Sequence, residues 1–570
     1  MNGRRAYLGL ALLLAGFAVV PLLAPGYFLG AHDAPHSLFF LVQFDQAIAD
    51  GALVPRWGPD HALGYGYPTF VFYSPLAYYL AEAFHLAGLG IAAAVKATFA
   101  LSLLASCVGM FLLAESMVGP AGGAIAALVY TYAPYRFVDI YVRAALAESC
   151  ALALYPWALW AFWRLAREPG RRRVAVAGLA YGLLLLSHNV TALLFTPLAM
   201  GAVVIGLVTA GHGRRPSAWL QAAGAGVLGV MLSAFSLLPS LLERGNIVQD
   251  QWTRATYSLT DHFVYVGQLL SPLWDYGYAV AGPEDAMSFQ LGLAPLALAL
   301  AGLALAGRTR AGRAVGLLFG GGLAAYVFLM VGASGPLWRA VTLLSLAQFP
   351  WRLLGVAALA AAGLSALAGA HLGRMRDKRA LVVLALAIVA VGLPYARPQH
   401  TAPDPRSEQP VGTVLFELEY TDMRGMTAWT QEMPQDSPKV AAYLAGGTLP
   451  LAQSDVPGTV VETVHQGGHV QTVRVTAAAP GTLQFHTYYY PGWAVTVDGA
   501  PAAIRPEGPL GLITLDLPAG SHTVSIRFGE TPLRRVANWI TLLTAGGAAL
   551  LAVPLRRYTH IRILNVKQQP

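Results

Sequence analysis

The residues best suited to chemistry lie in a polar segment that follows the first apolar stretch of the chain. The segment reads Gly30-Ala-His-Asp-Ala-Pro-His36 and places Asp33 between His32 and His36. A carboxylate there can act as a general base, because a hydroxyl group is a weak nucleophile near neutral pH. The alternative is a solvated loop side chain, or an N-cap for a helix near 36–50. His32, Asp33 and His36 are also candidate ligands for a divalent metal ion, and no other cofactor is indicated.

Three arginines are candidates to bind an anionic group. Arg352 follows Phe349-Pro-Trp351 and begins an apolar stretch, and Arg56 and Arg143 are the next candidates. A guanidinium group binds phosphate oxygens through two hydrogen bonds at once, which suits a substrate phosphate. The competing interpretation is that each side chain reaches lipid phosphates at a membrane surface.

Further polar residues interrupt the apolar stretches in the first half of the chain. Arg136, Asp139 and Arg143 are spaced by three and four residues, which favours an ion-pair ladder and leaves Asp139 as a candidate second catalytic carboxylate. Glu148 begins an apolar stretch, where an acid usually faces a cavity or a partner. His188 interrupts a long apolar run, either as part of a helix-joining turn or as a substrate contact. We therefore add Glu148, His188 and His36 to the candidate substrate-binding residues.

Several classes of protein are excluded by motif and charge. The chain has no phosphate-binding Walker loop, no zinc-protease His-Glu-x-x-His sequence and no nucleophile elbow. Its net charge of +8 comes from short basic clusters between apolar runs, which argues against nucleic acid as a partner. Cys107 and Cys150 lie in apolar stretches, so no disulfide framework is predicted.

The elements that position these residues are predicted to be membrane-spanning helices. The composition is 56% hydrophobic and 12% charged, and apolar stretches recur that are long enough to cross a hydrocarbon core of roughly 30 Å. Basic clusters hold 20 of the 37 Lys and Arg residues and mark the cytoplasmic side, with both termini on that side. The twelve predicted spans are 7–24, 92–114, 119–134, 147–164, 174–187, 191–209, 219–241, 288–306, 314–332, 350–370, 380–395 and 535–555.

Two details of this topology need comment. The stretch 69–87 is aromatic and contains Pro75, Glu82 and His85, so we interpret it as a helix lying on the outer surface within the first outer loop, 25–91. Arg534 and Arg535 fall on the outer side of the last helix, against the basic cluster at 556–567.

The C-terminal third has a different pattern. From about Thr413, alternating segments and turns replace the apolar blocks, and they predict a β-sandwich with turns at Asp498-Gly499 and Ala519-Gly520. The predicted strands are 470–476, 483–487, 494–498, 513–517 and 522–528. The domain division is therefore a transmembrane module over 1–396, a separable extracytoplasmic β-rich domain over 397–534, and a last helix with a cytoplasmic tail over 535–570. The aromatic residues Tyr488, Tyr489, Tyr490 and Trp493 of this domain fit a core better than a carbohydrate-stacking surface.

A resemblance to known families rests on several motifs along the chain. The early motifs are Asp33 after one span, Pro55-Arg-Trp57, Gly64-Tyr-Gly-Tyr-Pro68 and Tyr73-Ser-Pro-Leu-Ala-Tyr-Tyr79; the later ones are Val142-Arg-Ala-Ala-Leu-Ala-Glu148, Gln348-Phe-Pro-Trp-Arg352, Tyr489-Tyr-Pro-Gly-Trp493, Val497-Asp-Gly499 and Leu517-Pro-Ala-Gly-Ser-His522. Together they resemble the GT-C class of integral membrane glycosyltransferases. More narrowly, the chain resembles bacterial membrane proteins related by name to 6-pyruvoyl-tetrahydropterin synthase, and the YfhO-like group.

The resemblance implies a polytopic α-helical protein of about 12 transmembrane helices in the bacterial cytoplasmic (inner) membrane. It further implies sugar transfer, with inversion, from a polyprenyl-phosphate donor to a glycan, lipid or protein acceptor at the extracytoplasmic face. Asp33 is then the candidate base and Arg352 the leading phosphate ligand. A lipid-linked glycan transporter or flippase, and a non-catalytic envelope assembly protein, are the alternatives. A transporter is expected to place ionisable residues near the membrane midplane, whereas here they gather at outer loops.

Overall fold

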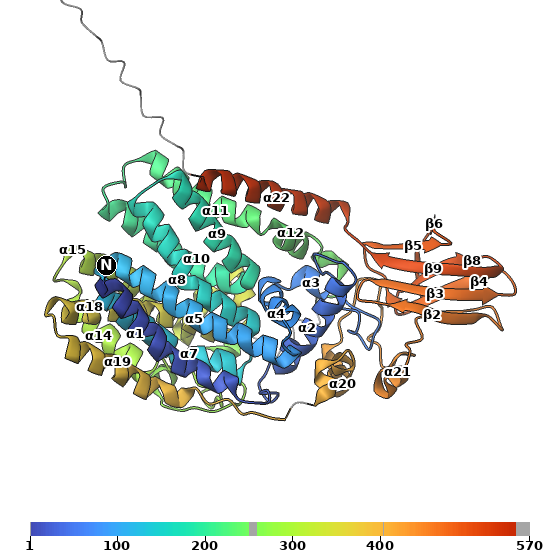
Figure 1. Ribbon diagram of the computed structural model, residues 1–570, viewed down its shortest axis with the longest axis horizontal. Coiled ribbons are helices and arrows are strands. Elements are labelled where there is room, and N and C mark those ends of the chain that lie inside the picture. The colour runs from blue at the N-terminus through green and yellow to red at the C-terminus, as the bar shows by residue number, and fades with distance from the viewer. Residues whose placement is uncertain (1, 250–258, 403, 554–570) are drawn as a thin grey trace, which may run out of the picture.

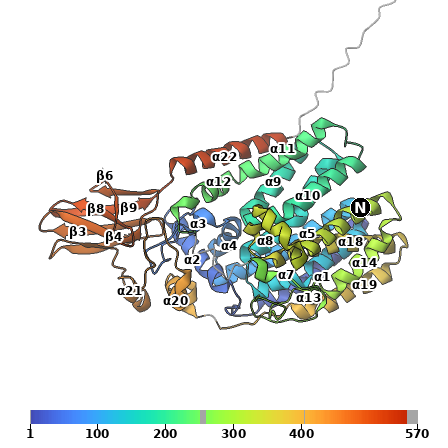
Figure 2. The same ribbon diagram turned by 180° about the vertical axis from the view of Figure 1, so that it is seen from behind.

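The computed structural model describes residues 2–249, 259–402 and 404–553. A bundle of helices forms one end of the molecule and a β-sheet domain forms the other, with the N-terminus at the far end of the bundle (Figure 1). The view from behind shows the same arrangement (Figure 2). The predicted basic cluster at 556–567 lies outside the described residues.

The helices fall into two groups along the chain. Those of the first half are α1 (Asn2–Val19), α2 (Ala34–Ala49), α3 (Thr69–Phe72), α4 (Leu76–Leu86), α5 (Ile91–Val118), α6 (Pro120–Thr131), α7 (Pro134–Phe137), α8 (Leu146–Arg167), α9 (Arg171–Ser187), α10 (Asn189–Thr209), α11 (Pro216–Leu232) and α12 (Ala234–Leu242). Those of the second half are α13 (Val266–Leu270), α14 (Leu293–Ala306), α15 (Arg310–Val315), α16 (Gly321–Met330), α17 (Gly335–Ala340), α18 (Leu354–Arg374), α19 (Lys378–Gly392), α20 (Val411–Glu419), α21 (Val440–Ala445) and α22 (Pro532–Ala552).

Helical structure is present at each of the twelve predicted spans. Within the described residues, 7 helices are long and apolar enough to cross a membrane, and the pair α11 and α12 would make an eighth. Two predicted spans correspond to shorter apolar helices, α6 and α14. The protein is therefore a multi-helix membrane protein, and the count of twelve spans stays a prediction. Helix α4 has only 11 residues, about 16 Å, which is too short to cross alone and agrees with a surface position for 69–87.

Several helix ends that the predicted topology assigns to one side of the membrane lie together in the fold. Arg4 at the start of α1 forms an ion pair of 2.7 Å with Glu115 at the end of α5. On the same side, Arg167 after α8 and Arg310 at the start of α15 line one cavity of about 710 Å³. The basic clusters 164–173 and 308–313 therefore share one side of the bundle, opposite the β-sheet domain (Figure 1).

The predicted span 219–241 corresponds to two helices joined at a sharp bend. Helix α11 ends at Leu232, and α12 leaves it at an angle of 74°. The side chain of Ser233 donates a hydrogen bond of 2.9 Å to the carbonyl of Val230, so it occupies a helical acceptor at the break. After the bend α12 packs against α22 and α3, which brings its C-terminal end towards the β-sheet domain.

The C-terminal domain contains two antiparallel sheets. The 4-stranded sheet has the order β1-β4-β8-β7 and the 5-stranded sheet β2-β3-β9-β5-β6. The strands are β1 (Ala452–Ser454), β2 (Val460–Gln466), β3 (Val470–Ala477), β4 (Gly481–Tyr488), β5 (Trp493–Val497), β6 (Ala500–Ala502), β7 (Arg505–Glu507), β8 (Leu512–Leu517) and β9 (Gly520–Phe528). All five predicted strands are confirmed within two residues at each end. At the predicted turn, Asp498 and Gly499 both have positive φ, 51° and 83°, as a two-residue hairpin of type I′ requires.

The core of this domain includes residues from outside the strands. The alternating pattern begins near Thr413, but α20 and α21 occupy the first part of that segment and the strands begin at Ala452. Buried side chains of both sheets form one cluster that also contains Trp57 and Tyr65 of the first outer loop. The ring of Trp57 lies 5.2 Å from that of Trp493, so the first outer loop contributes to the core of the domain. The core assignment is confirmed for Tyr488, Tyr490 and Trp493, which are buried, whereas Tyr489 is only partly buried, with its ring 4.8 Å from that of Trp429.

Candidate functional site

Several helix ends on the β-domain side of the bundle meet around one cavity. It has a volume of about 220 Å³ and lies where α2 and α8 begin, where α9 meets α10, and where α18 begins. Six of the eight site residues predicted from the sequence line it: Asp33, His36, Arg143, Glu148, His188 and Arg352. Residues separated by more than 300 positions in the chain are thus brought into one chamber.

Asp33 is held in the cavity wall by backbone pairing with the segment before α8. Its N–H donates to the carbonyl of Arg143 over 2.7 Å, and Ser37 on the next turn donates from Oγ to the carbonyl of Ala144 over 2.9 Å. Ala144 has a φ of 52°, a left-handed conformation that is costly for a residue with a Cβ. Asp33 occupies the N-cap position of α2, but its side chain makes no cap hydrogen bond. The capping alternative therefore does not account for its carboxylate.

Arg143 is the centre of a buried ion-pair cluster. Its Nη1 lies 2.8 Å from Oδ1 of Asp139 and 2.8 Å from Oε2 of Glu148, and its guanidinium stacks over the ring of Trp351 at 4.8 Å. Asp139 belongs to a π-helical turn, Val138–Val142, and such turns re-aim side chains next to functional sites. The predicted ion pair between Asp139 and Arg143 is present. Arg136 instead lies over the ring of Tyr130 at 5.5 Å.

Arg352 lines the same cavity. Its Nη1 donates to Oε1 of Gln348 over 2.8 Å and to the carbonyl of Ala347 over 3.1 Å, while Nε lies 3.6 Å from Oε2 of Glu148. Glu148 is thereby shared between two guanidinium groups, and it also accepts a hydrogen bond of 2.8 Å from Tyr135. A buried carboxylate between two arginines compensates their charge without consuming all of their donors.

Two histidines complete the cavity. His188 caps α10, and its Nδ1 accepts from the backbone N–H of Thr191 over 3.2 Å, so the helix-joining and cavity-lining interpretations both apply. His36 lies one turn after Asp33 on α2, with its ring 4.7 Å from that of Phe416. Burial lowers the pKa of His36, so its imidazole is neutral near neutral pH.

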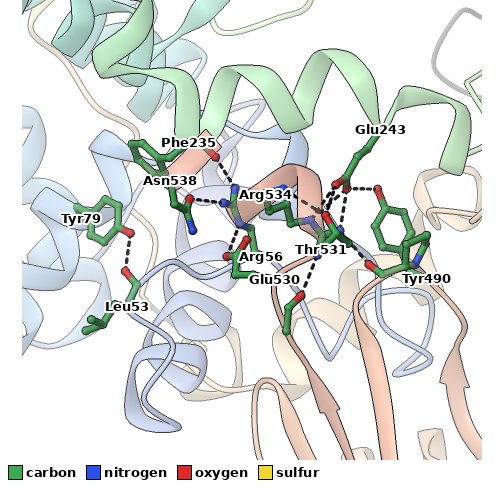
Figure 3. A network of polar contacts seen from close by, with 12 residues as sticks. Leu53, Arg56, Tyr79, Phe235, Glu243, Tyr490, Glu530, Thr531, Arg534 and Asn538 are labelled. Carbon is green, nitrogen blue, oxygen red and sulfur yellow. Dashed lines mark hydrogen bonds and ion pairs between the residues drawn. The ribbon is translucent and has the colours of Figure 1, made fainter. Parts of the chain in front are cut away.

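Two predicted site residues are not in the cavity. Asp139 is fully buried behind Arg143, so Glu148 takes the place of a second carboxylate in the wall. Arg56 lies in a separate polar network between the first outer loop, α12 and α22 (Figure 3). There it donates to Glu530 over 3.2 Å, to the carbonyl of Phe235 over 2.8 Å and to Asn538 over 3.3 Å. With its nitrogens engaged in this way, Arg56 joins structural elements, and the prediction that it binds substrate is corrected.

The arrangement gives no support to a metal site at His32, Asp33 and His36. His32 turns to the carbonyl of Gly277, 3.1 Å from its Nε2, and its ring stacks on Tyr278 at 4.0 Å. Across the described residues, no three His, Cys, Asp or Glu side chains are grouped as metal ligands.

The sequence did not reveal Ser37, Tyr73, Tyr78 or Gln348 as cavity residues. Gln348 offered one signal, since it begins the motif that contains Arg352. Its backbone has a φ of 62°, which places a strained residue at the cavity.

Comparison with solved structures shows distant likeness to several membrane transferases. One is the arabinofuranosyltransferase AftD from Mycobacteria, with 16% identity, a TM-score of 0.44, and coverage of 69% of this chain and 26% of that one. A second is ArnT from Cupriavidus metallidurans bound to undecaprenyl phosphate, with 15% identity, a TM-score of 0.41 and coverage of 72% and 75%. A third is the oligosaccharyltransferase from Archaeoglobus fulgidus in the apo form, with 13% identity, a TM-score of 0.43 and coverage of 76% and 60%.

These likenesses are too distant to assign an activity. This chain spans about a quarter of the length of AftD, and no curated protein matches it by sequence. A family model covers residues 70–397, more than half of the chain, and its description is "6-pyruvoyl-tetrahydropterin synthase related domain; membrane protein". The resemblance inferred from the motifs is thereby confirmed at the level of the family: the chain belongs to the 6-pyruvoyl-tetrahydropterin synthase-related membrane proteins.

Proposed function

We propose that this protein is a membrane glycosyltransferase that moves a sugar from a polyprenyl-phosphate donor to an acceptor hydroxyl, with inversion at the anomeric carbon. The observation that carries the proposal is the composition of the 220 Å³ cavity, where the carboxylate of Asp33 faces the same space as the guanidinium groups of Arg143 and Arg352. Sugar transfer from a lipid phosphate requires a base to deprotonate the acceptor hydroxyl and cations to stabilise the departing phosphate, and this cavity holds both.

The two arginines supply the phosphate site. The hydrogen bonds from Arg143 to Asp139 and Glu148 are donated by Nη1, and those from Arg352 to Ala347 and Gln348 also by Nη1. Nε of Arg352 faces Glu148, whereas Nη2 of both arginines and Nε of Arg143 take no part in these contacts, and we assign them to phosphate oxygens. Glu148 pairs with both arginine side chains, and the guanidinium group of Arg143 also lies over the ring of Trp351.

The proposed reaction is a single displacement. The acceptor O–H gives its proton to the carboxylate of Asp33 as the oxygen forms a bond to the anomeric carbon. The bond between that carbon and the phosphate oxygen breaks, and its electron pair leaves with the polyprenyl phosphate. Arg143 and Arg352 stabilise the negative charge that develops on this leaving group. Attack opposite the departing phosphate inverts the configuration.

The location of the cavity supports an enzyme over a transporter. The charged residues lie at helix ends and next to the first outer loop, not along the middle of the spans. We place this end at the extracytoplasmic face of a bacterial inner membrane, with both termini in the cytoplasm, since the basic clusters lie at the opposite end.

The test is binding of undecaprenyl phosphate to the full-length protein in nanodiscs, measured by native mass spectrometry, with undecaprenol as the phosphate-free control. Arg352→Gln should weaken phosphate binding by roughly ten- to a hundredfold, the cost of one charge-assisted contact. Arg352→Lys should recover only part, because it keeps the charge and loses the planar fork. Arg339→Gln, at an exposed arginine of α17, is the matched control. Equal binding of undecaprenol, or full phosphate binding by Arg352→Gln, would refute the proposed donor site.

A further inference from the structure

A second and larger cavity adjoins the first on the side of the β-sheet domain. It has a volume of about 440 Å³ and is enclosed by three segments that are far apart in the sequence: the first outer loop and α2, the end of α12 with residues 244–249, and α20 with residues 423–425. Backbone pairing joins two of these segments, since Ile247 bridges to Thr427 and the N–H of Val248 donates to the carbonyl of Met426 over 3.0 Å. The cavity is therefore a built feature of the outer face.

The two cavities share a wall. His36, Phe40 and Tyr73 line both of them. The rings of Phe40 and Tyr73 lie 5.2 Å apart, edge to face, while His36 lies one turn after Asp33 on the same helix. A ligand in the larger cavity consequently lies within a side chain's reach of the candidate base.

The wall of the larger cavity combines aromatic rings with polar atoms that have no protein partner. Phe39, Phe72 and Phe416 line it together with the shared pair Phe40 and Tyr73. Three buried polar atoms in the wall make no hydrogen bond among the described residues: Nδ1 of His36, Nε2 of His61 and Oγ1 of Thr69. Aromatic faces and a few unpaired donors and acceptors match the two surfaces of a sugar ring, its C–H faces and its equatorial hydroxyl groups.

The charged side chains in this wall have partners within the protein. Glu417 accepts hydrogen bonds from the N–H groups of Ala62 at 3.0 Å and Leu63 at 2.7 Å, and its Oε1 lies 3.2 Å from Nδ1 of His61. Both of those loop residues have positive φ, 52° and 57°, so the carboxylate stabilises a backbone conformation that few side chains favour. Arg244 is exposed and donates to Gln249 over 3.2 Å. The site does not demand a charged ligand.

We infer that the 440 Å³ cavity is the acceptor site and that the acceptor is a carbohydrate, stacked on Phe416 and Phe72 with a hydroxyl directed past His36 towards Asp33. This rests on the proposed function for the direction of transfer, but the carbohydrate site itself rests on the wall chemistry. A lipid chain would fill the aromatic part and leave the three polar atoms unpaired.

The test uses the full-length protein in nanodiscs with a panel of methyl glycosides of common pentoses and hexoses, read by saturation-transfer difference NMR. At least one glycoside should bind. Phe416→Ala should weaken it by roughly three- to tenfold, the value of an aromatic contact. Phe416→Leu, which keeps an apolar side chain of similar size, should weaken it in the same direction. Leu418→Ala, on the exposed side of α20, should change nothing.

The outcomes separate the two proposals. Undecaprenyl phosphate binding is measured in parallel and should be unaffected by Phe416→Ala, because Phe416 does not line the smaller cavity. Glycoside binding that depends on Phe416 supports the carbohydrate site whether or not undecaprenyl phosphate binds. If undecaprenyl phosphate does not bind, only the proposed transferase function is refuted. No glycoside signal, a signal indifferent to Phe416, or displacement of the glycoside by dodecanoate would overturn the carbohydrate site.

Discussion

The substitution Asp33→Asn separates catalysis from stability more sharply than any other in this chain. It keeps the shape of the side chain and its hydrogen-bonding capacity but removes the base. General-base catalysis typically contributes about 10²- to 10⁴-fold, so turnover should fall by about that factor, or about 3–5 kcal/mol in the activation barrier. Because the side chain of Asp33 makes no cap hydrogen bond, and Asn serves an N-cap position as well as Asp, α2 should be undisturbed. The free energy of unfolding should change by less than about 0.5 kcal/mol.

Glu148→Gln should behave in the opposite way. Its carboxylate is buried between Arg143 and Arg352, at 2.8 Å and 3.6 Å, and its loss leaves two guanidinium groups facing each other without compensation. Breaking a buried pair by removing one partner typically costs about 3–5 kcal/mol, so this variant should lose stability together with activity. Asp45→Asn, a partly exposed carboxylate on the same helix as Asp33, should lose neither.

The assay follows conversion of a polyprenyl-phosphate-linked sugar to polyprenyl phosphate by mass spectrometry, with membranes from a strain lacking this protein as the source of acceptor. Thermal unfolding of each purified variant is measured in parallel. Asp33→Asn should appear as a stable, inactive protein. Near-normal turnover by Asp33→Asn would remove the assignment of the base, and the non-catalytic assembly role would then be the better interpretation. A large fall in its unfolding temperature would show that the carboxylate is structural.

Two further substitutions test how the outer segments hold together. Trp57→Ala should cost about 3–5 kcal/mol and expose the β-sheet domain to limited proteolysis, since the indole packs between Trp493 and Phe528; unchanged proteolysis would mean that the loop does not complete this core. Burial raises the pKa of Asp60 from 3.8 to about 6, so this group favours the folded state below pH 4 and loses that contribution, about 3 kcal/mol, as the pH rises through 6. Between pH 4 and 6.5, the thermal stability of Asp60→Asn should not show this pH-dependent loss. A stability profile identical to that of the parent protein would contradict the raised pKa of Asp60.

The sequence identified most of the charged residues that line the smaller cavity, because this cavity lies at helix ends. Asp33, Glu148, His188 and Arg352 each interrupt or flank an apolar stretch, and a polar group at that place is recognisable without a structure. The helices that bring these residues together were also visible as apolar blocks. Which of the flanking residues share one cavity is a matter of tertiary packing, and Arg56 shows the limit. It has the same local signature as Arg352, yet the partners that engage it, Glu530 and Asn538, are more than 470 positions away.

The segment between residues 411 and 445 could not be predicted for a related reason. Its residues alternate in polarity as strands do, yet α20 forms there because its buried face is required by the first outer loop. Glu417 accepts the N–H groups of two loop residues, and Lys439 on the segment before α21 donates to the carbonyl of Gly64 over 2.5 Å. These contacts span more than 350 positions. Local propensity is overridden by such tertiary partners.

Arg534, which the predicted topology places on the outer side against the usual distribution of basic residues, has a partner far away in the sequence. Arg534 is fully buried, and its Nη2 lies 2.7 Å from Oε2 of Glu243 at the end of α12 (Figure 3). Positive residues orient a membrane protein through their interaction with the lipid surface and the translocation machinery, and a buried cation with a carboxylate partner contributes little net charge there. Of the two adjacent arginines only Arg535 then remains exposed to oppose the predicted orientation. Glu243 follows the last residue of α12, so the helix beyond the bend ends at this ion pair. The ion pair between Glu243 and Arg534 therefore links two features that the sequence did not predict: the 74° bend between α11 and α12, and the burial of Arg534.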